Sequence, residues 1–393
     1  MPSPSQGRFK WPVDFLQTLV DCILPRRQKQ RQRQSQDKQQ SPPTSSEDSA
    51  NMVKRLILST GHLVLLRSNI SVGGGSSLIR KPGAFRSNLE LTNSLRNNFL
   101  AAKQEYDSSS QGSKNSTPNG HSNGNGNTNG APNGISSPLA QWTSLEGNGD
   151  LYVPRIDWDA TPGLQEDAAA YDITVKIFFL PTSTLSQRAA YTREALSLVM
   201  KELRVSAVSL LIVSFPGMSF EGDCEWEADK HNATQGDDEG ELATWESAIE
   251  PLYHEGLVGR LGIAEFGSEK LSRFLEGVSV KPGVDQINIK NCCDVPPPLV
   301  SLAKEKNIEL FVHSDCTDIL PKGTLRELLG QGPKGAGVLA DPADGVERED
   351  KEEEEGLRGD LTPQWVVKYT AVVRDRGVIE SKGYFAGAAL TEE

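Results

Sequence analysis

The stretch Asp285–Cys316 reads DQINIKNCCDVPPPLVSLAKEKNIELFVHSDC and decides the fold. A short apolar run comes first, a triple proline then opens a segment with helical spacing, and a second apolar run follows. This order predicts a strand, a helix and a strand, which is the repeating unit of a parallel sheet. Each predicted strand ends in side chains of chemical interest: Cys292 and Cys293 follow the first, and His313 and Cys316 follow the second.

The same layout recurs upstream, where apolar runs alternate with helix-like segments. Strands are predicted at 172–180, 207–215 and 257–266, and helices at 184–204, 241–256 and 268–277. The run at 207–215 is almost continuously apolar, which is typical of a parallel strand covered on both faces. Residues 365–385 instead alternate around Gly377, so they predict a terminal antiparallel pair.

Two architectures fit this alternation, a doubly wound sheet and a closed (β/α)8 TIM barrel. A dinucleotide-binding doubly wound sheet carries a G-x-G-x-x-G turn between strand and helix, and Gly73–Gly75 lacks both that spacing and a following helix. We therefore favour the α/β barrel. Residues 52–393 without their inserts provide about the 250 residues that such a barrel needs.

Three segments have compositions that cannot bury a core. Residues 1–51 are rich in Gln, Ser and Arg and are predicted to be a disordered extension, with Met52 as a natural start of the chain. Low-complexity inserts are predicted at 107–137, which is rich in Ser, Gly and Asn, and at 342–360, which is centred on a run of glutamates. The barrel is assigned to the rest of 52–393.

The chain has 393 residues, a formal net charge of −12 and 5 cysteines. We expect no nucleic-acid partner, because contacts with phosphates dominate that affinity and favour basic proteins. The odd number of cysteines predicts reduced thiols in the cytosol or nucleus, and we expect a cytoplasmic location. We expect no membrane association, since no apolar run reaches roughly 18 residues. The basic run Arg26–Arg33 is interpreted as a solvated tail in preference to a nuclear address.

The predicted strand ends resemble those of the aldo-keto reductases. Lys176 in VKIFF and Gln286 in DQINI match residues of that family, and the resemblance implies that both are vestigial contacts to NADPH. Ser214 in IVSFP stands where the family has its catalytic histidine, and Ala264–Glu265 stands where it has a Ser–Asn pair. No counterpart of the family's catalytic Tyr and Asp is found before Asp172. The resemblance therefore implies an aldo-keto-reductase type of barrel without reductase activity.

A second resemblance covers more of the chain. LILSTGHLV at 56–64, residues 172–321 and WVVKYTAVVRDRGVIESKGY at 365–384 resemble the regulatory (modifier) subunit of glutamate–cysteine ligase. The resemblance implies a heterodimer with the ligase catalytic subunit, better use of glutamate and relief of feedback inhibition by glutathione, with no catalysis and no cofactor of its own. Two alternatives stay open: an active NADPH-dependent reductase, and a pseudo-enzyme that senses NADPH.

Further candidate residues follow from the same strand ends. Thiols that could form a disulfide with the catalytic subunit are Cys224, Cys292, Cys293 and Cys316. The same thiols together with His313 suggest zinc only weakly, because vicinal cysteines seldom bind one metal ion, so no metal is predicted. Residues 222–241 are interpreted as an exposed acidic loop, a natural docking surface in which Trp226 is a candidate anchor.

Overall fold

A ten-stranded sheet organises the residues that the structure describes, and its strand order is β2-β3-β1-β10-β9-β4-β5-β6-β7-β8. The computed structural model describes residues 52–61, 86–112, 137–288, 294–315, 318–341 and 356–391. All of them belong to one unit, Asp48–Glu393. The predicted extension at 1–51 lies outside the described residues.

A run of parallel strands forms one half of the sheet. Its strands are β4 (Tyr171–Phe179), β5 (Val208–Ser214), β6 (Val258–Ala264), β7 (Val284–Asn288) and β8 (Glu309–His313). Helices connect them in the βαβ manner: α4 (Leu185–Leu203), then α5 (Glu225–Asn232), α6 (Asp238–Thr244), a π-helical turn and α7 (Glu250–His254), then α8 (Ser268–Gly277) and α9 (Pro297–Lys306). The predicted α/β class is confirmed.

The other half of the sheet contains the chain ends. The long strands β9 (Asp360–Val373) and β10 (Val378–Thr391) form the predicted antiparallel pair, and they lie between β1 (Arg55–Ser59) and β4. Two short strands, β2 (Ser144–Leu145) and β3 (Asp150–Val153), extend the sheet beyond β1. Among the described residues no pairing joins β2 to β8, so in this part of the chain the sheet is open and does not close into a barrel.

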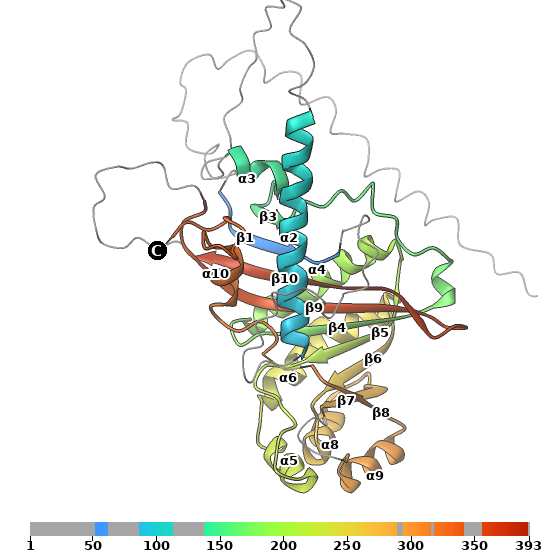
Figure 1. Ribbon diagram of the computed structural model, residues 1–393. Helices are drawn as coiled ribbons and strands as arrows, with labels where there is room; N and C mark the ends of the chain where they lie inside the picture. The colour runs from blue at the N-terminus through green and yellow to red at the C-terminus, as the bar shows by residue number, and fades with distance from the viewer. Residues whose placement is uncertain are drawn as a thin grey trace, which may run out of the picture. The chain divides into compact units, whose positions relative to one another are not determined.

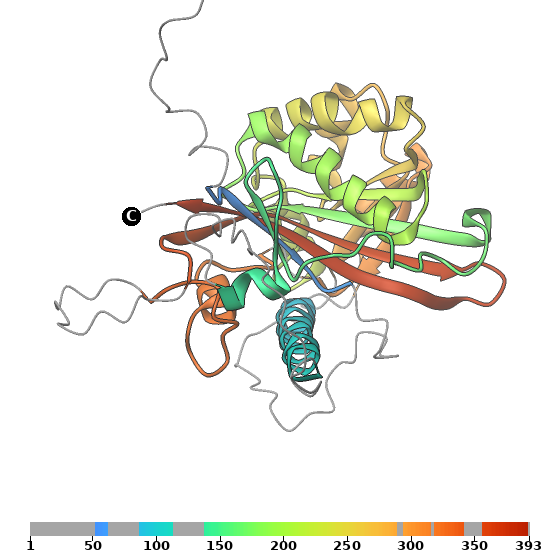
Figure 2. The same ribbon diagram turned by 90° about the horizontal axis from the view of Figure 1, so that it is seen from above.

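Two layers of helices bury the two faces of the sheet. The larger core lies between the parallel strands and α4 to α9. The second core packs α2 (Arg86–Gly112), α3 (Ser137–Trp142) and α10 (Thr324–Leu329) against β1, β3 and β10. Figure 1 shows α2 crossing in front of β10 and β9, and Figure 2 shows it on the opposite side of the sheet from the helices between β4 and β8.

The structure differs from the sequence prediction at three boundaries. Helix α2 continues to Gly112, into the stretch 107–137 assigned to an insert. At the second insert, Leu357 already pairs with Leu339 and Asp360 begins β9. The predicted acidic loop at 222–241 instead contains the whole of α5 and the start of α6. The physical reason is that α5 has acids in its first turn and bases in its last turn, which complements the helix dipole.

No helix in the described parts of the chain combines the length and the apolar character that a membrane span requires.

Candidate functional site

Lys176 lies at the centre of a buried group of charged and polar side chains. It is the sixth residue of β4. Its neighbours Val175 and Ile177 point into the core on the side of the sheet that α4 covers, so strand alternation turns Lys176 to the other side. Its ammonium donates a hydrogen bond to Gln286 Oε1 at 2.9 Å and lies 3.4 Å from Asp315 Oδ2. The two residues that the sequence assigned to a vestigial cofactor site are therefore in direct contact.

Asp315 bridges two lysines. Its Oδ1 accepts a hydrogen bond from Lys368 Nζ at 2.7 Å, while its Oδ2 faces Lys176. Lys368 comes from β9, where it is the register partner of Lys176. Asn288 holds the backbone of Asp315 by donating from Nδ2 to its carbonyl oxygen at 2.9 Å. A single carboxylate thus ties together β4, β9 and the segment after β8.

His313 links the same group to β6. Its Nδ1 accepts the backbone N–H of Asp315 at 3.1 Å, so the ring proton lies on Nε2. Nε2 is 2.7 Å from Glu265 Oε1 and 3.1 Å from the carbonyl oxygen of Gln286. We call these six residues the Lys176 cluster: Lys176, Glu265, Gln286, His313, Asp315 and Lys368.

Glu265 has a left-handed backbone, with φ of +67°, immediately after β6. Such a conformation is uncommon for a residue with a side chain and costs about 1 kcal/mol or more. Three bonds fix it: the Glu265 N–H donates to the Gln286 carbonyl at 2.9 Å, its carbonyl accepts from Asn232 Nδ2 at 2.6 Å, and its carboxylate faces His313. The residue therefore joins the buried cluster to the loop that carries α5.

Burial and pairing oppose each other in the electrostatics of the cluster. Burial lowers the pKa of Lys176, and the nearby carboxylates of Asp315 and Glu265 only partly offset that effect. Burial also resists ionisation of Asp315, but the two neighbouring lysines outweigh it and hold the pKa of Asp315 well below its usual value. At Asp285, next to Gln286, the charge of Lys176 and the backbone N–H groups of Phe266 and Gln286 do not offset burial. Burial and then the charge of Glu265 raise the pKa of Asp285 well above its usual range.

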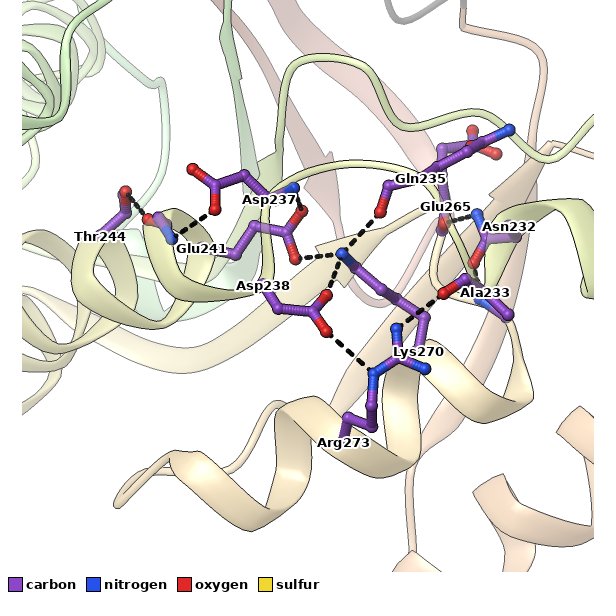
Figure 3. A network of polar contacts seen from close by, with 12 residues as sticks. Asn232, Ala233, Gln235, Asp237, Asp238, Glu241, Thr244, Glu265, Lys270 and Arg273 are labelled. Carbon is purple, nitrogen blue, oxygen red and sulfur yellow. Dashed lines mark hydrogen bonds and ion pairs between the residues drawn. The ribbon is translucent and has the colours of Figure 1, made fainter.

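A second buried lysine was not predicted from the sequence (Figure 3). Lys270 on α8 is 1% exposed, and its ammonium lies 2.8 Å from both Glu241 Oε2 and the carbonyl oxygen of Gln235. Asp238 accepts from the same ammonium and from Arg273. We call these five residues, Lys270, Gln235, Asp238, Glu241 and Arg273, the Lys270 network.

Two further side chains join α5 to the segments that follow β5 and β6 and to the start of α8. Asn232, its last residue, donates to the carbonyl oxygens of Ser219 and Glu265 and accepts the N–H of Gly267 at 2.6 Å. Asp229 accepts the backbone N–H and the hydroxyl of Ser268, both at 2.6 Å, and so caps the start of α8. These contacts make the position of α5 a fixed feature of the fold.

The remaining predicted site residues divide into two groups. Cys224 and Trp226 lie on the surface at the start of α5, where Cys224 is an exposed free thiol and Trp226 is 56% exposed. Cys292, Cys293 and Cys316 lie outside the described residues. Ser214 is buried at the end of β5, as expected for a strand-end residue. No group of acids, histidines and cysteines within the described ranges has the arrangement of a metal site.

The chemistry open to the Lys176 cluster is limited by its own pairing. The amine of Lys176, the imidazole of His313 and the carboxylate of Asp315 each contact a partner within the protein. Paired in this way, these groups tie together the strands that carry them. The fold and the cluster define an α/β protein in which the polar groups at the strand ends form hydrogen bonds and ion pairs with one another.

Comparison with known proteins identifies the family. The chain is 30% identical over 239 residues to a protein of Schizosaccharomyces pombe described as a candidate glutamate–cysteine ligase regulatory subunit, covering 58% of this chain and 74% of that relative. It is 27% identical over 144 residues to the mouse regulatory subunit, covering 37% of this chain and 45% of the relative. For the human regulatory subunit the values are 23% over 216 residues, 55% and 65%. The chain belongs to the glutamate–cysteine ligase regulatory subunit family.

No family model matches the chain. Solved aldo-keto reductases are among the structures to which it is similar. One from Bombyx mori, in complex with NADP, has a TM-score of 0.26 and 20% identity over 36% of this chain and 40% of that one. The aldose reductase of Schistosoma japonicum has a TM-score of 0.25 and 23% identity over 35% and 43%.

Proposed function

We propose that this chain is a non-catalytic regulatory subunit that binds the catalytic subunit of a glutamate–cysteine ligase. The observation that carries the proposal is the 30% identity to a regulatory subunit over 74% of that relative's length. The proposed effects are better use of glutamate and relief of feedback inhibition by glutathione. Physically, such a subunit acts through a coupling free energy: it binds one conformation of the catalytic subunit more tightly than another.

The pairing within the Lys176 cluster supports a role without catalysis. Proton transfer to a substrate carbonyl needs a donor within hydrogen-bond reach of it. Lys176 donates to Gln286, Lys368 donates to Asp315, and the Nε2 proton of His313 faces Glu265. An assay of NADPH oxidation with a panel of aldehydes is expected to give no turnover above background.

We expect the same residues to bind no nicotinamide cofactor. The amide oxygen of Gln286 already accepts from Lys176, and the carboxylate of Glu265 stands at the position where the resemblance implied a neutral polar residue. A sensing role would rest on the retained contact of Lys176 with Gln286. Titration of NADPH with the full chain, followed by nicotinamide fluorescence, is expected to show no saturable enhancement, and saturable binding would revive the sensing alternative.

The direct test of the regulatory role is the glutamate dependence of ligase rate. The catalytic subunit is assayed with and without this chain, and again with glutathione added. A lower apparent KM for glutamate and weaker inhibition by glutathione are expected, since the chain favours the competent conformation. An unrelated acidic protein at the same concentration is the control. Unchanged curves together with separate elution of the two chains would contradict the proposal.

We also propose that Cys224 is a redox contact to the catalytic subunit. The thiol is exposed and precedes α5, so it is accessible to a partner's thiol. A disulfide would form with loss of both thiol protons and transfer of two electrons to an added oxidant such as oxidised glutathione. A non-reducing gel of the oxidised complex should show a higher-mass band that Cys224→Ser removes. Persistence of the band in that variant would move the role to another cysteine.

A further inference from the structure

Helix α5 presents a large aromatic side chain to solvent on a backbone that the fold holds rigidly. Trp226 is 56% exposed, whereas the large aromatic rings of Trp245 and Trp365 are fully buried. An exposed Trp on a fixed helix loses little conformational freedom on binding, and such residues often dominate the affinity of protein interfaces.

Three buried polar residues, Asp229, Asn232 and Lys270, hold the end of this helix and the segment after it. Such burial is costly unless each group has a partner. Lys270 donates hydrogen bonds to Gln235 and Asp238, which follow α5 in the chain. Asn232 donates to the carbonyl oxygen of Glu265, and Asp229 caps α8. Figure 3 shows the Lys270 and Asn232 contacts. None of these bonds involves Trp226. They hold the segment that displays it.

The charge around Trp226 indicates what kind of surface it meets. Four acids flank it in sequence, Glu221, Asp223, Glu225 and Glu227, and the basic residues Lys230 and His231 lie at the far end of α5. Glu221 and Asp223 are exposed. A partner with matching charge is basic, and attraction of this kind steers association and weakens as salt is added.

We propose that Trp226 and the acids before it form the docking surface of this chain for a basic surface with an apolar slot on the ligase catalytic subunit. The inference rests on the proposed function, because the partner is the one named there. Trp226 fills the slot, and Glu221 and Asp223 lie against the surrounding lysines or arginines.

The experiment measures binding of the full chain to immobilised catalytic subunit at several salt concentrations. Trp226→Ala is expected to weaken binding about 30-fold or more. Tyr253→Ala is the matched control, because Tyr253 is an aromatic residue 41% exposed on a different helix, α7. The control should bind within about twofold of the original chain. The double variant Glu221→Lys with Asp223→Lys should bind more weakly and reduce the dependence on salt.

Each outcome separates the surface from the function. If the original chain binds and Trp226→Ala binds equally well, the docking surface is wrong while the regulatory role stands. Equal losses in Trp226→Ala and Tyr253→Ala, or an unchanged salt dependence in the charge variant, would likewise overturn it. If the original chain neither binds nor changes the glutamate dependence, the proposed function itself fails. Circular dichroism and the unfolding midpoint confirm that each variant is folded.

Discussion

Adjacent residues of β9, Lys368 and Tyr369, lie at two buried sites whose carboxyl groups have pKa values shifted in opposite directions. Lys368 points to one face of the sheet and joins the Lys176 cluster, where Asp315 contacts two lysines. Tyr369 points to the other face and lies beside Glu202 of α4, whose Oε2 has no hydrogen-bond partner among the described residues. The neighbouring lysines keep Asp315 ionised, whereas burial keeps Glu202 protonated.

The Glu202 site is tightly enclosed. Glu202 is 6% exposed, and Gly61, just after β1, approaches so closely that a Cβ there would be 2.7 Å from Oε1. Burial raises the pKa of Glu202 to about 8. Burial and then the charge of Glu202 raise the pKa of Tyr369 well above its usual value. The comparison teaches that burial alone does not fix the charge of these two acids, because the two lysines beside Asp315 outweigh its burial.

The largest expected effect is that of Asp315→Ala. The substitution leaves Lys176 buried without its counter-charge, and removal of one partner of a buried pair typically costs about 3–5 kcal/mol. Urea denaturation followed by tryptophan fluorescence measures the free energy of unfolding. Asp172→Ala is the control, because Asp172 forms an exposed pair with Arg374 at 2.8 Å and should cost at most about 1 kcal/mol. Equal losses of unfolding free energy in the two variants would show that Asp315 contributes no more to stability than a member of an exposed ion pair.

The pH dependence of this site follows from the lowered pKa of Asp315. Its folded-state pKa is below the unfolded value, so the pairing contributes stability above the unfolded pKa and loses it as pH falls through the folded value. Asp315→Ala should therefore lose most stability, relative to the original chain, near neutral pH and progressively less in acid.

Glu202→Gln is expected to have the second-largest effect, with the opposite sign. The folded-state pKa is about 8 against an ordinary value of 4.5, so the folded state holds a proton that the unfolded state has lost between those values. Stability of the original chain therefore falls as pH rises from 4.5 through about 8 and then levels off. Glutamine stays neutral, so the variant should gain about 2–4 kcal/mol over the original chain at alkaline pH.

The measurement is the free energy of unfolding of both proteins at pH 5.5, 7 and 9, as a rough series across the titration. The difference between them should grow with pH. Glu255→Gln is the matched control, because Glu255 is an exposed carboxylate paired with Arg193, and it should show no growing difference. A constant difference at all three pH values would mean that Glu202 is already ionised in the folded state.

The sequence predicted the elements that surround both sites better than the contacts inside them. The parallel strands, α4 and α8 were each expected within a few residues of their observed bounds, since their apolar periodicity depends only on local sequence. The antiparallel pair was expected at 365–385 and extends over 360–391. Lys176 and Gln286 were named as site residues and are in contact. The contact itself was not predicted, because β5 and β6 lie between β4 and β7 in the strand order and a strand–helix–strand pattern places only neighbouring strands side by side.

The rest depends on information that local sequence does not contain. Lys368 enters the cluster only because β9 is inserted beside β4 in a register that pairs it with Lys176, and the sequence does not specify that insertion. Lys270 and Glu202 occupy helix positions that look solvated until the neighbouring elements are placed. The charged first and last turns of α5 were visible in the sequence, and they were the signal that a helix lay within the acidic segment.

The smallest expected effect sharpens the comparison most. Combining Lys176→Met with Asp315→Leu removes both members of the buried pair and leaves apolar side chains in their place. Replacement of a buried ion pair by apolar residues is often close to neutral, so the double variant should lie within about 1 kcal/mol of the original chain, far above Asp315→Ala. Lys368 can tolerate the change because its side chain is 21% exposed and its ammonium can reach water.

A double-mutant cycle built on Lys176→Met and Asp315→Leu as single variants then gives the coupling energy of the pair. If the double variant loses as much stability as the two single variants combined, Lys176 and Asp315 are independent, and the contrast with Glu202 rests on burial alone.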